Sequence, residues 1–431
     1  MYDKEDWPYK LLSWAAEHNI RHVIPENKDI MLRMRSININ VNTRHISDHE
    51  VITNSIHFLP DEIGYLTNLT SIKILNNSLY SIPASIGKLN NLVSIRVDMA
   101  AIDSEFPKSI LELKELKELG ISKSAIKELP IWFGMLFSLK KLSFTRGRLT
   151  ELIPEIGNLT SLEELDISNN KLTELPESIK NLASLKKLIV RDNNLEKLPE
   201  CIGNLTSLEE LDISNNKLTK LPESIKNLAS LKKLIVRDNN LAELPEYIGS
   251  LASLEELDIS DNKLTELPND TWNLPRLRKL LIGNTHGSMN RNKIVELPEN
   301  IYNLINLTHL NIANNSVVKL SDDLAKLTNL ISLNAYQNRL TEIPDSIGQL
   351  SKLQALDIQA NRDLNKIPKS VTTLGSVEIR SNFIKPSKAY SFSQIPVLDE
   401  QLSFCEQYKI EIERKKMFSC LVEIEITYIS D

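Results

Sequence analysis

Leucine and isoleucine recur at fixed intervals along this chain, with charged or small polar residues between them. The stretch LPESIKNLASLKKLIVRDNNLEK (175–197) follows the frame LPxxIxxLxxLxxLxLxxNxLxx. About 14 copies of this frame, most of them 23 residues long, follow one another between Leu59 and Ile384. Such a period indicates structural units that bury their apolar faces against their neighbours.

The two halves of each copy predict different local structures. Residues two apart, such as Leu165 and Ile167, point to the same face of an extended chain, so LxLxxN predicts a short strand. The LPxxIxxL half returns the chain on the outer side, and its proline favours a short turn or 3₁₀ segment over a full helix. We therefore predict an α/β repeat solenoid with a parallel concave β-sheet and short turns or 3₁₀ segments on the convex side.

An asparagine follows the strand in most copies, where the chain bends away from the sheet; Asn170 and Asn193 are examples. Its amide can bond to backbone groups that the bend would otherwise leave unpaired. Three early copies carry Ala100, Ser124 and Gly147 at this position instead.

The complete frame resembles the bacterial leucine-rich-repeat proteins of the LPxxIxxLxxLxxLxLxxNxL type, and it is similar to plant intracellular Ras-group-related repeats. The resemblance covers about three quarters of the chain and implies a leucine-rich-repeat horseshoe that acts as a protein-interaction scaffold. The frame residues are structural, so no functional residue is carried over. Some secreted effectors of enteric pathogens join similar repeats to a ubiquitin-ligase domain with a Cys-x-Asp nucleophile. Here Cys420 precedes Leu-Val and Cys405 precedes Glu-Gln, so we expect that domain to be absent.

The segments that flank the repeats predict small caps. Pro8 and the apolar spacing after it predict a helix over about 7–18, and the alternating stretch 37–41 predicts a strand that pairs with the first repeat. Near the other end, a helix is expected over about 397–417 and a strand over 421–429. Capping is one interpretation of this tail. Pairing with another chain is the alternative, because an exposed strand edge invites it.

These elements divide the chain into three parts. They are an N-terminal cap over 1–58, the leucine-rich-repeat solenoid over 59–384 and a C-terminal cap over 385–431. Within the solenoid, extra residues at 285–291 predict a polar loop at the carboxyl end of a strand.

Composition narrows the classes of function. The net charge of −6 over 431 residues gives no electrostatic case for nucleic-acid binding. The three cysteines form no CxxC pattern, so we expect a reducing compartment. The start MYDKEDWPYK lacks the layout of a signal peptide, and no long apolar run is present. We therefore expect no membrane partner, and either a cytoplasmic protein or one delivered into a host cell without a cleavable signal peptide.

Motifs of catalysis and cofactor binding are not recognisable. The patterns GxxxxGK[ST], GxSxG, HExxH and GxGxxG are absent, and His18 and His22 lie four apart without an evident third ligand. Acidic pairs such as Glu163-Glu164 recur too regularly to mark one convergent site. We expect no enzymatic activity, no cofactor and no metal.

The strand residues between the buried ones face the concave side. Adjacent strands, about 4.8 Å apart, would align Glu164, Lys187, Glu210, Lys233, Glu256 and Lys279 in a row of alternating charge. Two interpretations stay open. The row either neutralises the sheet or forms a partner footprint together with Ile189, Arg191, Ile235 and Arg237. Because 158–203 recurs nearly unchanged at 204–249, duplication alone could have copied this pattern.

Towards the C-terminal end the concave positions carry less charge. The candidate partner-binding residues there are His309, Asn311, Ser332, Asn334, Tyr336, Asp357 and Gln359. Tyr336 stands where neighbouring copies carry small or polar residues, and exposed tyrosine is typical of interfaces. We hypothesise that a protein partner binds this patch, helped by the 285–291 loop.

The sequence as a whole therefore predicts a non-enzymatic scaffold that binds a protein partner on its concave face. We expect it in a bacterial cytoplasm or as an effector in a host cell. The alternative is a self-associating structural protein that uses the C-terminal strand edge. We expect a monomer, with a homodimer as the alternative.

Overall fold

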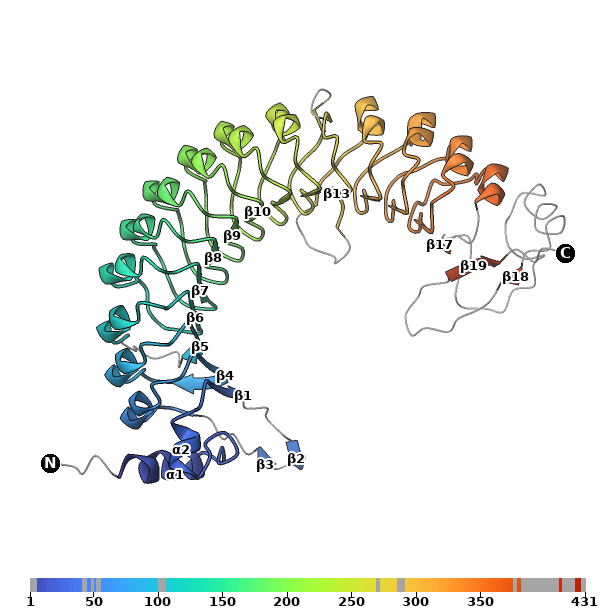
Figure 1. Cartoon of the computed structure of the whole chain (residues 1–431). Coiled ribbons are helices and arrows are strands. Elements are labelled where there is room, and N and C mark those ends of the chain that lie inside the picture. The colour runs from blue at the N-terminus through green and yellow to red at the C-terminus, as the bar shows by residue number, and fades with distance from the viewer. Residues whose placement is uncertain are drawn as a thin grey trace. The chain divides into compact units, whose positions relative to one another are not determined.

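The computed structural model describes most of the chain (Figure 1). The described residues are 6–40, 45–47, 50–51, 56–99, 106–268, 272–284, 291–374, 378–380, 411–412 and 423–427. The chain forms two compact units, Met1–Leu211 (unit 1) and Asp212–Asp431 (unit 2).

One repeat shows how the sequence produces each coil. Pro176 has an extended backbone, with φ −70° and ψ 149°, and the 3₁₀ helix η6 (Glu177–Asn181) begins directly after it. The bonds of this helix run three residues back, from Ile179 N to Pro176 O at 3.0 Å and from Leu182 N to Ile179 O at 3.1 Å. The chain then enters the short strand β9 (Lys187–Ile189). The predicted 3₁₀ segment after the proline is confirmed.

The same 3₁₀ element recurs along the described part of the chain, opposite the strands in each unit (Figure 1). In unit 1 the other members are η1 (Asp61–Tyr65), η2 (Ala84–Lys88), η3 (Lys108–Glu112), η4 (Ile131–Met135), η5 (Pro154–Asn158) and η7 (Glu200–Asn204). In unit 2 they are η8 (Glu223–Asn227), η9 (Glu246–Ser250), η10 (Glu299–Asn303), η11 (Asp322–Lys326), η12 (Asp345–Gln349) and η13 (Lys369–Thr373).

The strands of unit 1 form a parallel sheet in the order β1-β4-β5-β6-β7-β8-β9. Besides β9 they are β1 (Ser36–Asn40), β4 (Ser71–Leu79), β5 (Ser94–Met99), β6 (Glu118–Ser122), β7 (Lys141–Thr145) and β8 (Glu164–Asp166). The strand β10 (Glu210–Asp212) contains the boundary between the units.

Unit 2 continues the pattern with parallel strands in the order β11 to β17. They are β11 (Lys233–Ile235), β12 (Glu256–Asp258), β13 (Lys279–Leu281), β14 (His309–Asn311), β15 (Ser332–Asn334), β16 (Ala355–Asp357) and β17 (Glu378–Arg380). The predicted repeat solenoid with a parallel sheet is confirmed.

The core of each coil consists of the aliphatic frame residues. In the repeat at 175–197, Ile179, Leu182, Leu188 and Val190 are completely buried. Leu188 aligns with Leu165 on the preceding strand, so each repeat covers the apolar face of its neighbour. A single repeat could not bury this surface alone.

Where an asparagine follows a strand, its side chain bonds to the backbone, as predicted; Asn193 is an example. Asn193 Oδ1 accepts a hydrogen bond from Leu172 N at 3.0 Å. Its Nδ2 donates to Ile167 O and to Val190 O, both at 3.0 Å. The network therefore links two consecutive coils through one buried amide.

A helix and a strand occupy the N-terminal flank. The helix α1 (Trp7–Glu17) confirms the predicted helix, and β1 pairs with β4 of the first repeat, as expected. Trp14 Nε1 donates to Phe58 O at 3.0 Å, and the Trp7 ring stacks on the Tyr65 ring of η1 at 5.3 Å. The structure adds a short helix α2 (Lys28–Met31) and an antiparallel pair, β2 (His45–Ser47) and β3 (Glu50–Val51). The division of the chain into caps and solenoid stays a prediction.

The C-terminal helix expected over 397–417 is wrong at Glu411–Ile412, which form the strand β18. β18 pairs antiparallel with β19 (Glu423–Thr427), with Ile412 opposite Ile426. The apolar spacing in this segment was loose, and hydrogen bonding to a neighbouring strand satisfies its backbone instead.

The strand expected over 421–429 is confirmed for Glu423–Thr427. It pairs antiparallel with β17 through Ile424 and Ile379, in addition to its pairing with β18. The remaining residues of the tail, and residues 285–290 of the expected polar loop, lie outside the described residues.

Candidate functional site

The parallel register turns repeated sequence positions into rows across the sheet. Two positions of each strand point away from the core. The first row contains Lys141, Glu164 and Lys187, and the second row contains Ser143, Asp166 and Ile189. In unit 2 the first row is Lys233, Glu256, Lys279, His309, Ser332 and Ala355.

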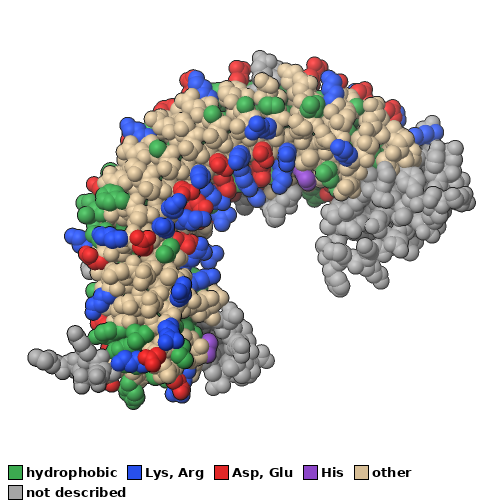
Figure 2. All heavy atoms as spheres, in the orientation of Figure 1, with side chains coloured by type: hydrophobic (Ala, Val, Ile, Leu, Met, Phe, Trp, Pro, Cys, Tyr) green, Lys and Arg blue, Asp and Glu red, His purple; other side chains and the backbone are tan. Residues whose placement is uncertain are grey.

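Ion pairs connect neighbouring strands along the first row. Their N–O distances are 2.6 Å for Lys141–Glu164, 2.8 Å for Lys187–Glu210, 3.4 Å for Lys233–Glu256 and 3.8 Å for Lys279–Glu256. Figure 2 shows these alternating positive and negative side chains on the sheet face. Of the two interpretations of the row, neutralisation of the sheet is therefore supported by direct contacts.

A second set of ion pairs lies one residue before the strands. Glu163 accepts from Lys140 Nζ at 2.6 Å and from Lys186 Nζ at 2.8 Å, on the preceding and the following strand segments. The hydrogen bonds from these two ammonium groups lower the pKa of Glu163 to about 2.

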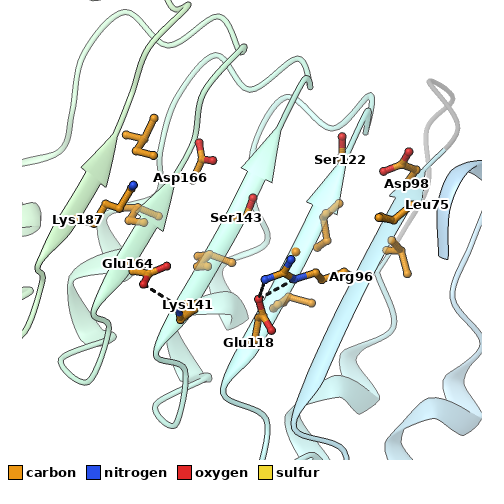
Figure 3. Close-up of a pocket in the computed structure, with 17 residues that line it drawn as sticks. Leu75, Arg96, Asp98, Glu118, Ser122, Lys141, Ser143, Glu164, Asp166 and Lys187 are labelled. Atoms are coloured by element: carbon orange, nitrogen blue, oxygen red, sulfur yellow. Dashed lines mark hydrogen bonds and ion pairs between the residues drawn. The ribbon is translucent and has the colours of Figure 1, made fainter. Parts of the chain in front are cut away.

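The sheet face of unit 1 is hollowed between β4 and β9 (Figure 3). The depression has a volume of about 380 Å³. Its floor is low because the second row has no side chain at Gly120 and a small one at Ser143. Arg96, which neighbours Gly120 in this row, reaches across to Glu118 of the first row, with Nε 2.7 Å from Oε1. The stem of Arg96 lies beside the Gly120 position, with Cγ 3.2 Å from where a Cβ on Gly120 would be.

Charged groups form both sides of the depression. On the first-row side, burial opposes ionisation of Glu118, but hydrogen bonds from Arg96 and Ser94 outweigh it and lower its pKa. On the opposite side, Asp98 accepts from Lys123 Nζ at 2.9 Å. The depression thus combines a small-residue floor with ion pairs that fix its walls, an arrangement suited to holding part of a ligand.

Of the four predicted footprint residues in the duplicated block, Ile189 lines this depression. Arg191 is exposed, with Nε 3.8 Å from Asp192 Oδ2. Ile235 and Arg237 belong to unit 2, and Arg237 Nε donates to the buried Asp261 Oδ2 at 3.0 Å. Arg237 is therefore engaged in an ion pair inside unit 2.

The predicted patch near the C-terminal end is arranged by the register of β14 to β16. His309 aligns with Ser332, and Asn311 aligns with Asn334. The second-row asparagines bond to the backbone two residues farther along their own chain segment. Asn311 Oδ1 accepts from Ala313 N at 2.9 Å, and Asn334 Oδ1 accepts from Tyr336 N at 3.0 Å.

The last members of this patch differ in exposure. Asp357 Oδ1 accepts from Gln359 N at 3.1 Å. Gln359 has only 5% of its surface exposed, whereas Tyr336 and His309 are half-buried. Gln359 therefore offers little side-chain surface on this face, and Tyr336 and His309 are the largest of the half-buried members.

The pattern of the sequence did not lead us to predict the depression at Gly120. The signal was present, because LKELGIS (116–122) places glycine where the duplicated copies carry Asp166 or Ile189. A glycine inside a strand often marks close approach of another backbone.

The described residues contain no group of three or more metal-ligating side chains. Cys201 is half-buried, and desolvation together with its bond to Glu177 O raises the pKa of the thiol to about 11. Such a thiol stays protonated near neutral pH and is a poor nucleophile. Among the described helices, none combines the length and the apolar character needed to cross a membrane.

Comparisons with known proteins agree with this geometry. The family model described as "Leucine-rich repeat region" matches residues 132–236, and the one described as "Leucine rich repeat" matches 229–286 and 305–362. A leucine-rich-repeat protein of Leptospira interrogans has a similar structure. It is 32% identical, the match covers 82% of this chain and 86% of that chain, and the TM-score is 0.72. No curated protein sequence matches this chain significantly.

Two more distant structures share the fold alone. An internalin from Listeria monocytogenes is 20% identical, with 86% of this chain and 93% of that chain covered and a TM-score of 0.59. A plant peptide hormone receptor, RGFR1, solved in complex with RGF2, is 24% identical. This match covers 75% of this chain and 61% of that chain, with a TM-score of 0.58.

The chain belongs to the leucine-rich-repeat family. Proteins of this family generally act in protein–protein interaction.

Proposed function

We propose that this chain is a non-enzymatic interaction scaffold that holds a segment of a protein partner against the sheet face of unit 1. The depression over Gly120 and Ser143 is the observation that carries this proposal. It is a concave site of about 380 Å³, within the size range of ligand sites of about 300–1,000 Å³. A side chain of the partner fills the space that the second row leaves empty at Gly120.

The residues around the depression favour a polar partner segment. Lys141, Glu164 and Lys187 present both signs of charge on one side, and Asp98 and Asp166 lie on the other (Figure 3). Because these walls are held by ion pairs within the chain, they are ordered before the partner arrives. Preorganised walls reduce the entropic cost of binding.

The patch on β14 to β16 of unit 2 is the second proposed contact surface. Its candidate residues are His309, Asn311, Ser332, Asn334, Tyr336, Asp357 and Gln359, of which Tyr336 and His309 carry the proposal because they are its largest half-buried side chains. The related fold of a receptor solved with RGF2 supports binding of a protein ligand in general.

Filling the depression tests the proposal. In Gly120→Ile, the new Cβ would lie 3.2 Å from Arg96 Cγ, so the flexible Arg96 side chain must shift by a few tenths of an ångström to make room. Isoleucine also suits a strand better than glycine. We expect Gly120→Ile to weaken binding of the natural partner about tenfold or more, a loss of about 1.4 kcal/mol.

The measurement is a comparison of tagged variants. Wild type, Gly120→Ile and the double variant His309→Ala/Tyr336→Ala are used to recover proteins from lysates, and the affinity of each recovered protein is then measured by titration. A partner lost with Gly120→Ile alone supports the unit 1 site, and one lost with the double variant alone places the contact in unit 2. Equal recovery of the same partner by all three proteins would contradict both proposed sites.

The alternative function, self-association through the C-terminal strand edge, has weaker support. In that tail β19 already pairs with β17 and β18 of the same chain, so its backbone groups are used internally. A bacterial cytoplasm or a host cell remains the proposed location, based on the cysteine pattern.

A further inference from the structure

A second concave surface lies at the turns that follow the strands of unit 2. It is a groove of about 730 Å³. Its lining includes Tyr336 and four basic residues, Arg291, Lys293, Arg339 and Arg362. We call these four residues and Tyr336 the cationic groove.

The charge of this groove is not neutralised by its surroundings. All four basic side chains are exposed, and Asp363 is the single acidic residue in the lining. Within the described part of the chain, none of the four forms an ion pair. This differs from the first row of the sheet, where lysine and glutamate alternate and pair.

The excess of positive charge arises from a change at one repeat position. This position is the residue with positive φ just before the asparagine that follows the strand. In earlier copies of unit 2 this residue is Asn215, Asp238 or Asp261, and Asp261 bonds to Arg237. In the groove it is Gln337 or Ala360, and in the copy before them it is Asn314. The cationic groove therefore lacks the acidic group that Asp238 and Asp261 supply in their copies.

We propose that the cationic groove binds a short, extended, acidic segment of a protein partner. Arginine recognises carboxylate groups through two parallel hydrogen bonds, and Tyr336 adds the amphipathic contact surface that interfaces favour. The interaction goes beyond the unit 1 site, because no residue of the Gly120 depression takes part in it.

The spacing of the cations matches such a segment. Lys293, Arg339 and Arg362 occupy the same position in their copies, with Ser316 between the first two. Strands about 4.8 Å apart place Lys293 and Arg362 roughly 15 Å apart. An extended chain rises about 3.3 Å per residue, so about five residues span the groove.

The same features disfavour a nucleic acid. A nucleic acid carries a continuous run of phosphates and is bound by long basic stripes, whereas this basic region is short and ends at Asp363. The chain as a whole also has a net charge of −6, which repels an extended polyanion.

The experiment uses the full-length protein and a fluorescein-labelled hexaglutamate peptide, with binding followed by fluorescence anisotropy. The test variant is Arg339→Gln/Arg362→Gln. The control variant is Lys217→Gln/Lys263→Gln, which removes two exposed lysines from the same repeat position outside the groove. Thermal unfolding by circular dichroism confirms that both variants are folded.

We expect the wild type to bind the peptide, the test variant to bind at least about tenfold more weakly and the control to stay within about twofold. Gly120→Ile should bind hexaglutamate like the wild type, which separates this inference from the unit 1 proposal. The inference is overturned by any of four results. These are no binding by the wild type, equal losses in both variants, tighter binding of a single-stranded oligonucleotide than of the peptide, or full competition by inorganic phosphate at peptide-like concentrations.

Discussion

At the residue scale, many polar side chains of the sheet face serve the backbone of their own strand. Asp258 Oδ1 accepts from Ser260 N at 3.0 Å, and Asn311 and Asn334 make the equivalent bond two residues on. The chain turns sharply here, and short side chains with an acceptor oxygen bond to the turn locally. Polar type alone therefore does not mark a second-row residue as a partner contact.

The same turn explains a conformational preference. The residue before the ladder asparagine has a positive φ, for example 56° at Asn169 and 57° at Asp192. Asparagine and aspartate tolerate this region better than other residues with a side chain. The recurring NN and DN pairs of the sequence thus carry two roles, a left-handed turn followed by a buried amide.

Glu163 gives a prediction at this scale. Its pKa is lowered to about 2 from an ordinary value of 4.5 by Lys140 and Lys186. Because the folded-state pKa is depressed, the stabilisation is present above about pH 4.5 and is lost as the pH falls towards 2. An NMR titration of the Glu163 carboxyl carbon should show a midpoint near 2 in the wild type.

Matched variants test whether Lys140 and Lys186 are the cause of the lowered pKa of Glu163. Lys140→Met/Lys186→Met should raise the midpoint of Glu163 towards 4.5, whereas Lys171→Met, which removes an exposed lysine outside this cluster, should leave it in place. High salt should also raise it, because exposed ion pairs are screened. A wild-type midpoint already at the ordinary value contradicts the prediction.

At the element scale, the asparagines that follow the strands form a ladder, and each one, such as Asn193, joins its own coil to the preceding coil. The bonds of Asn193 serve Leu172 N, Ile167 O and Val190 O, all of which are buried. A lost partner for a buried polar group costs about 1–3 kcal/mol. We expect Asn193→Ala to lower the free energy of unfolding by about 2–4 kcal/mol, measured by urea denaturation.

The adjacent asparagine is the control. Asn194 is half-buried, and its side chain takes no part in the ladder. Asn194→Ala should therefore change the free energy of unfolding by about 0.5 kcal/mol or less. Equal effects of the two substitutions would show that the ladder bonds contribute nothing special to stability.

At the scale of the whole molecule, the core is nearly the same in each copy of the repeat, whereas the proposed binding surfaces occur at irregular copies. The frame residues are nearly identical from copy to copy, so the core is uniform in both units. The Gly120 depression of unit 1 and the cationic groove of unit 2 arise where copies depart from the frame, at Gly120 and after Arg291. Irregular copies, and not the duplicated block, are therefore the place to look for partners.

The oligomeric state is a prediction for the molecule as a whole. Because β19 is paired within its own chain, we expect a monomer, with a mass of 49.0 kDa by multi-angle light scattering. The mass should stay constant across a wide dilution series. A rise towards twice this mass with concentration would favour the self-association alternative.

Sequence by itself determined the repeat, the strand and 3₁₀ halves of each coil and the role of the ladder asparagine. These depend on residues close together in the chain and on a period that repeats unchanged, so local spacing was sufficient. The order of charges along the first row also followed, because parallel strands in constant register align equal positions.

Only the tertiary structure decided where the surface is hollow and where charge is left unpaired. The depression depends on Arg96 bonding to Glu118 of the neighbouring strand, and the cationic groove depends on residues from several turns being brought together. The strand at Glu411–Ile412 depended on a partner strand farther along the chain. In each case the deciding contact joins residues of different copies or distant segments, which a local pattern does not specify.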